Sequence, residues 1–107
     1  MIHPRLTAVL IGSALISAGA FAQDGNVQRG AGLYAAKTCN LCHTLAGESG
    51  PMAEMGGSLD NLGSKRDAAW IRAYLKDPTG TLPGATMPKV ELTEQEIADL
   101  TAFMLAH

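Results

Sequence analysis

The sequence predicts an all-α domain with about three main helices, over residues 27–37, 66–76 and 94–106, joined by irregular loops. Three observations predict this class. Apolar or small residues recur at i, i+3 and i+4 within each of the three segments. Glycine and proline collect in the two connecting stretches, 44–63 and 77–92, where they oppose regular structure. No stretch is rich in the residues that favour β-strands.

Residues 1–22 have the pattern of a secretory signal peptide, which leaves 23–107 as one predicted domain. The firm positive charge of Arg5 precedes an apolar or small run, 6–22, that ends in the A-x-A cleavage sequence before Gln23. The alternative is an uncleaved membrane anchor, but a run of 17 residues is at the short end of the spanning range. After cleavage we expect no contact with a membrane.

The helix over 27–37 follows Asn26, a residue type that caps helix N-termini. Its apolar face includes Gly30 and Tyr34. Gly30 and Gly32 lower the helix propensity, but a glycine on a buried face lets another helix approach closely. Two tolerated glycines in a weak helix are the alternative.

Cys39-Asn40-Leu41-Cys42-His43 is a C-x-x-C-H motif, the attachment signature of a c-type haem. Each thiol can add to one porphyrin vinyl group, and His43 can then offer a ring nitrogen to the iron as the proximal ligand. A thioredoxin-like dithiol would need a βαβ pattern, and a zinc site would need two more ligands. The other histidines, His3 and His107, lie at the ends of the chain, and there is no third cysteine. Haem attachment is therefore the preferred interpretation.

The two stretches after the motif suit a haem pocket. The irregular segment 44–63 can wrap the edge of a flat cofactor, with Leu59 and Leu62 as apolar contacts. The helix over 66–76 can be capped by Ser64 or Asp67, and Pro78 disfavours helix at Asp77. On one face of this helix, Trp70 and Tyr74 belong either to the core or to the cofactor site, where a haem propionate can accept from their polar tips.

Met87 is the candidate for the distal axial ligand of the iron. A thioether is a weak, soft ligand, so it needs a rigid backbone, and three prolines stiffen the loop 77–92. Met52 and Met55 compete for this role, whereas Met104 lies on a helical core stripe. A further alternative is that Met87 only packs on the haem and leaves the sixth position open.

The last helix is marked by a capping box, in which Thr93 and Glu96 satisfy each other's backbone N–H groups. Ile97, Leu100 and Met104 then follow at helical spacing. This stripe is predicted to pack on the first helix and to close the haem crevice.

Together these motifs resemble a small class I c-type cytochrome of the monohaem cytochrome c family. The residues that carry the resemblance occur in the family's order: Cys39, Cys42, His43, Gly50-Pro51, Trp70 and Met87-Pro88. The resemblance covers nearly all of the chain after residue 25. It implies the cytochrome c fold around one covalently attached haem c. One departure is that the aromatic Tyr34 lies five residues before Cys39, where four is common in the family.

The resemblance implies more specific contacts. The first helix would cross the last, with Gly30 and Tyr34 at the contact. The carbonyl of Pro51 would accept the second ring N–H of His43, which orients a metal-bound imidazole; an ordinary Gly-Pro turn is the alternative. For Trp70, the resemblance supports a hydrogen bond to a propionate. Because haem is attached to such proteins outside the cytoplasm, the expected location is the periplasm.

Charge and composition argue against a nucleic-acid binder and for a small core. The chain has a net charge of −2, and loss of Arg5 with the leader leaves seven basic and ten acidic residues, a charge of −3. Two Phe, two Tyr and one Trp are the only aromatic residues. A domain of this size is marginal on its own, so we expect haem to complete the core and the apoprotein to be largely unfolded.

The expected function is electron transfer between redox proteins that dock transiently. With His43 and Met87 both on the iron, no position is left for a substrate, so we expect a carrier and not an enzyme. Two alternatives remain. The chain could be the haem subunit of a larger dehydrogenase or oxidase complex, or an open-site haem protein with weak peroxidase or gas-binding activity.

Overall fold

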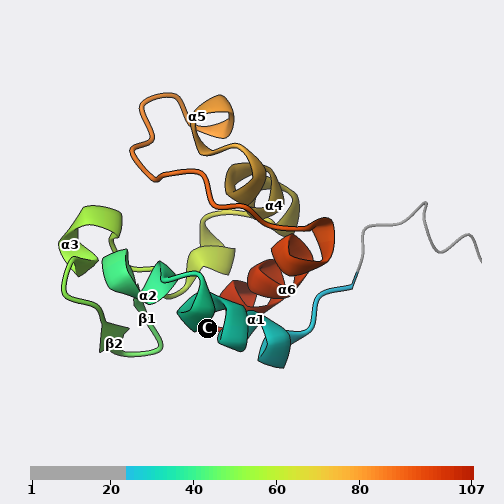
Figure 1. The fold of residues 1–107 in the computed structure, drawn as a ribbon, viewed down its shortest axis with the longest axis horizontal. Coiled ribbons are helices and arrows are strands. Elements are labelled where there is room, and N and C mark those ends of the chain that lie inside the picture. Colours follow the sequence, from blue (N-terminus) through green and yellow to red (C-terminus); the bar gives the residue numbers. More distant parts are fainter. Residues whose placement is uncertain (1–23) are drawn as a thin grey trace, which may run out of the picture.

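Three helices dominate the structure, a computed structural model that describes residues 24–107 (Figure 1). They are α1 (Val27–Ala36), α4 (Ala68–Lys76) and α6 (Glu94–Leu105). Their bounds lie within two residues of the predicted ones, and the predicted all-α class is confirmed. The predicted leader, 1–22, lies outside the described residues. Within residues 24–107, no helix is both long enough and apolar enough to cross a membrane.

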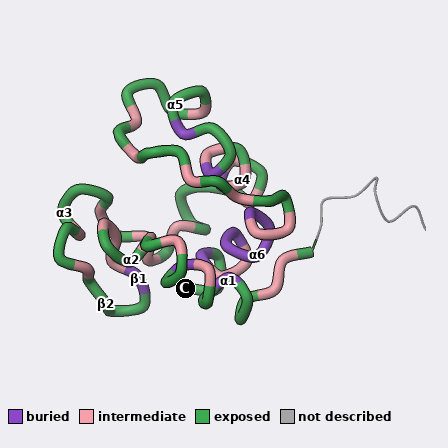
Figure 2. Tube along the Cα trace, viewed as in Figure 1, coloured by how far each residue is buried: buried purple, intermediate pink, exposed green. Residues whose placement is uncertain are grey.

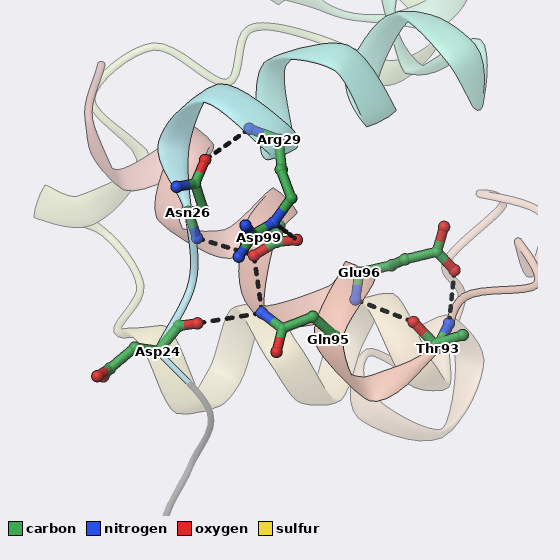
Figure 3. A network of polar contacts seen from close by, with 7 residues as sticks. All are labelled: Asp24, Asn26, Arg29, Thr93, Gln95, Glu96 and Asp99. Atoms are coloured by element: carbon green, nitrogen blue, oxygen red, sulfur yellow. Dashed lines mark hydrogen bonds and ion pairs between the residues drawn. The ribbon is translucent and has the colours of Figure 1, made fainter.

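Each main helix begins at a side-chain cap that the sequence indicates. The Asn26 side chain accepts from the backbone N–H of Arg29 at 2.8 Å. Asp67 accepts from the N–H of Trp70 at 2.8 Å, so Asp67, and not Ser64, caps α4. Thr93 and Glu96 form both bonds of the predicted capping box at the start of α6 (Figure 3).

The stretch 44–63 contains more regular structure than its glycines predict. It holds β1 (Thr44–Leu45), β2 (Glu48–Ser49), α3 (Ala53–Gly56) and the 3-10 turn η1 (Leu62–Ser64). The two strands pair antiparallel across Ala46 and Gly47, whose φ angles of 54° and 80° are those of a type I′ hairpin. The expectation of an irregular segment was therefore wrong in detail, because short turns close locally even where longer elements cannot form.

The loop 77–92 also contains one helical turn, α5 (Pro78–Thr81). Pro78 ends α4 at Lys76 as predicted, but its fixed φ also suits the first position of a new turn. The side chain of Asp77 caps this turn by accepting from the N–H of Gly80 at 3.2 Å. The chain from residue 82 to the start of α6 has no helix or strand.

Helix α6 forms the centre of the fold and packs against both α1 and α4 (Figures 1 and 2). At the α1–α6 crossing, a Cβ on Gly30 would run into the backbone of Asp99 and the Cβ of Phe103. The rings of Tyr34 and Phe103 meet there with centroids 5.4 Å apart. The predicted crossing at Gly30 and Tyr34 is confirmed. The buried apolar core comprises Tyr34, Leu45, Ile71, Leu75, Ile97, Leu100 and Met104.

A buried carboxylate joins the start of α1 to α6 (Figure 3). The side chain of Asp99 is 3% exposed and accepts from the N–H of Asn26 at 2.8 Å, from Nε of Arg29 at 3.1 Å and from Nε2 of Gln95 at 2.9 Å. Burial alone would raise the pKa of Asp99, but these hydrogen bonds outweigh it and lower the pKa below its usual range. Gln95 also donates to the carbonyl of Asp24, so residues 24–26 are held on α6.

Candidate functional site

The two cysteines occupy the first and last positions of the one-turn helix α2 (Cys39–Cys42). A separation of three residues places both thiols on the same side of this turn. Both are half-buried and free, and burial raises the pKa of the Cys39 thiol. Thr38, which precedes the turn, has a φ of 61°, and this left-handed residue separates α2 from α1. The chain thus presents two reduced thiols together, as covalent attachment at both requires.

His43 leaves the turn in an extended conformation, and its ring nitrogen Nδ1 lies 3.2 Å from the carbonyl oxygen of Gly57. With the proton on Nδ1, the ring donates to this carbonyl and keeps Nε2 as a metal ligand. The expected acceptor was Pro51, but the structure gives this hydrogen bond to Gly57. The cause is a parallel bridge between Thr44 and Ser58, which brings residue 57 beside the histidine.

Gly56 and Gly57 were not identified as site residues in the sequence. A Cβ on Gly56 would lie 2.5 Å from Cε1 of His43 and 2.7 Å from its Nδ1, so only glycine lets the loop lie against the ring. Gly57 has a φ of 74°, which favours glycine. The adjacent pair of glycines was the one available signal in the sequence.

Two adjoining hollows of about 260 and 230 Å³ form a central cavity, and His43, Gly56, Tyr74 and Met87 line both. The smaller hollow is mainly apolar. It brings together every predicted cofactor-contact side chain except Pro51 and the Cys42 thiol, namely Cys39, Leu59, Leu62, Trp70 and Tyr74. Cys42 lines the larger hollow. Pro51 is exposed and lines a separate hollow on the side of α3.

Of the three methionines considered as axial ligands, Met87 alone lines both parts of the central cavity. Met55 borders the larger part but is 70% exposed. Met52 lines the separate hollow together with Pro51. Met104 also lines the smaller part, but it is a buried core residue at 5% exposure, as its place on a helical stripe predicts. Met87 is therefore the methionine that shares both parts of the cavity with His43.

The side chains around the central cavity fit a haem c. Two thiols on one turn, an imidazole with its second nitrogen bonded, a half-buried thioether and apolar walls surround a single space. Among residues 24–107, no group of three or more His, Cys, Asp or Glu side chains is arranged to hold a metal ion directly. The site thus has the donors that a haem c takes.

An aromatic stack forms one wall of the cavity. The rings of Trp70 and Tyr74 are 5.0 Å apart between centroids and within 14° of parallel. Cζ of Arg66 lies 4.0 Å from the centroid of the Trp70 ring. Arg66 was not singled out in the sequence, where its spacing of four residues from Trp70 was the only signal.

Comparison with protein families agrees with this geometry. The family model described as Cytochrome c matches residues 27–107. The matched range contains all three main helices and every residue that lines the central cavity. No curated protein matches the chain.

Proposed function

Because the chain belongs to the cytochrome c family, we propose that it is a periplasmic monohaem carrier that passes single electrons between redox proteins. Membership of the family implies electron transfer and one covalently bound haem c, for which the two cysteines of the C-x-x-C-H motif are the attachment thiols. The observation that carries the more specific proposal is that His43 and Met87 line the same central cavity.

In this proposal, each residue of the site has a separate task. When bound, haem c supplies an iron atom that alternates between the ferrous and ferric states. Cys39 and Cys42 would each add across one vinyl group of the porphyrin: the sulfur bonds to one vinyl carbon, the C=C double bond becomes a single bond, and the thiol hydrogen ends on the other carbon. His43 would bind the iron through Nε2, while the carbonyl of Gly57 fixes its ring and raises its basicity. Met87 would offer its thioether as the second protein ligand, which would leave no position on the iron for a substrate.

The walls of the cavity favour the reduced state. Leu59, Leu62 and Leu75 line its smaller part, where they exclude water and lower the local polarity. An apolar surrounding disfavours the additional positive charge of the ferric state, and methionine ligation acts in the same direction. With His43 and Met87 both supplied by the protein as ligands, oxidation and reduction would need little rearrangement of the chain.

The location and partners follow from the sequence and from the role of a carrier. The predicted leader supports export to the periplasm. A carrier must release its partner after each transfer, which favours a small interface and transient docking with a donor and an acceptor. The net charge of −3 expected for the mature chain gives no indication of nucleic acid as a partner.

An optical spectrum of the purified holoprotein tests the proposed ligands. The ferric wild type is expected to show the weak long-wavelength band of methionine-ligated haem. Met87→Ala should abolish this band and lower the midpoint potential. The matched control Met55→Ala should keep the band and the midpoint potential of the wild type. Rapid binding of carbon monoxide by the reduced wild type would instead support an open site. An unchanged band in Met87→Ala would show that another methionine is the ligand.

A further inference from the structure

The stack of Arg66, Trp70 and Tyr74 connects the surface of the protein to the wall of the central cavity. Trp70 and Tyr74 are four residues apart, which places their side chains along one side of α4, and Arg66 precedes the N-cap residue Asp67 of this helix. Trp70 and Tyr74 are half-buried and line the cavity, whereas Arg66 is exposed. The guanidinium covers the Trp70 ring at 4.0 Å.

The contact has the geometry of a cation–π interaction. A guanidinium within about 6 Å of an indole centroid is attracted by the negative face of the ring. Its planar shape also stacks on an aromatic surface, which an ammonium group does not do in the same way. With Tyr74 stacked on Trp70 as well, the indole contacts planar groups from residues both before and after it in the sequence. These contacts restrict its rotation.

The charge of Arg66 is not neutralised by a carboxylate. Arg66 takes no part in the ion pairs of Arg29 with Asp99 or of Lys76 with Glu94, and no carboxylate among residues 24–107 forms an ion pair with it. A guanidinium group carries a positive charge throughout the physiological pH range. A permanent positive charge therefore lies one aromatic ring away from the space that is lined by His43 and Met87.

We propose that Arg66 positions Trp70 at the cavity wall and that its charge raises the reduction potential of the bound haem. This inference rests on the proposed function. A nearby cation disfavours the more positive ferric state and so stabilises the ferrous one. The rigid indole keeps the wall of the cavity closed on that side.

Three variants of the holoprotein separate charge from stacking. Arg66→Gln removes the charge and the stack, and Arg66→Lys keeps the charge but loses the planar group. Lys65→Gln is the matched control, because it removes an exposed neighbouring cation that lies over no ring of residues 24–107. The measurements are the midpoint potential in a redox titration and the near-UV circular dichroism of the indole, to which Trp70, the only tryptophan, contributes alone.

We expect Arg66→Gln to lower the midpoint potential by more than Lys65→Gln does, with a larger difference at low salt. The indole bands should weaken in both Arg66→Gln and Arg66→Lys. The midpoint potential of Arg66→Lys should stay close to that of the wild type. The proposal is overturned if Arg66→Gln shifts the potential no more than the control, or if its indole bands equal those of the wild type. The wild-type spectrum and covalent haem staining test the proposed function independently of these variants.

Discussion

Nδ1 of His43 lies 3.2 Å from the carbonyl oxygen of Gly57, a residue 14 positions further along the chain. The bond forms because Gly56, which has no side chain, lets the loop lie flat against the imidazole. A backbone acceptor at this distance fixes the plane of the ring and directs Nε2 away from the loop.

Gly56→Ala should disturb this contact, because the added methyl group would lie 2.5 Å from Cε1 of His43. We expect a loss of about 1–3 kcal/mol in the free energy of unfolding, as in other overpacked sites. The midpoint potential should rise, because a histidine without its acceptor is a less basic ligand. Gly63→Ala is the control, since its Cβ would approach only the flexible end of Leu105. Equal effects of the two substitutions would contradict the role given to Gly56.

Gly30→Ala tests the crossing of α1 and α6. A methyl group at Gly30 meets backbone atoms of Asp99, which cannot move aside. We therefore expect α1 to be displaced and the free energy of unfolding to fall by about 2 kcal/mol or more. Gly32, on the same helix, has open space around its Cβ position. Gly32→Ala should therefore stabilise the protein by up to about 1 kcal/mol through helix propensity. Chemical denaturation of both variant holoproteins should show a lower free energy of unfolding for Gly30→Ala and a higher one for Gly32→Ala.

Asp99→Asn should weaken the attachment of residues 24–26 to α6. Three hydrogen bonds to a buried charged group are lost or weakened. We therefore expect the free energy of unfolding to fall by about 2 kcal/mol at neutral pH. The pKa of Asp99 is lower in the folded protein than in the unfolded chain. Its carboxylate therefore stabilises the fold at pH values above the ordinary pKa, and this stabilisation is lost as the pH falls through the pKa of the folded protein. The free energies of unfolding of wild type and Asp99→Asn should thus become similar in acid. A stability difference that stays constant with pH would contradict this.

Tyr34→Phe should leave stability at neutral pH nearly unchanged or slightly higher. The hydroxyl is buried and has no hydrogen-bond partner within the described residues, so its removal abolishes a desolvation cost. Burial raises the pKa of Tyr34 from its ordinary value of 10.0 to about 12. The wild type should therefore lose stability as the pH rises from about 10 toward 12, because the unfolded chain releases this proton first.

The measurement is the urea unfolding free energy of each holoprotein across this alkaline range. The variant should lack the part of the alkaline loss that Tyr34 causes. Identical alkaline slopes for wild type and Tyr34→Phe would show that the tyrosine does not titrate in this way.

Cys39→Ala combined with Cys42→Ala should prevent covalent attachment of haem and leave the chain largely unfolded. A domain of this size buries little apolar surface to compensate for chain entropy without the cofactor. Haem staining on a denaturing gel and far-UV circular dichroism measure the two effects. A cooperative melt with near-native helix content would contradict the role of haem in the core.

The sequence by itself determined the features that depend on neighbouring residues. Asn26, Asp67 and Thr93 begin helices because a cap acts within one turn of the chain. The two cysteines and His43 are adjacent, so their chemistry was visible as a motif. The apolar stripe of α6 indicated that Met104 belongs to the core and left Met87 free for the cavity.

Only the tertiary structure decided the contacts between distant segments. Gly57 in place of Pro51 as the partner of His43 depends on the bridge that joins Thr44 to Ser58. Asp99 meets Asn26 across 73 residues of sequence. Local patterns carry no information on which loop closes against which ring, since that choice is made by the packing of the whole chain.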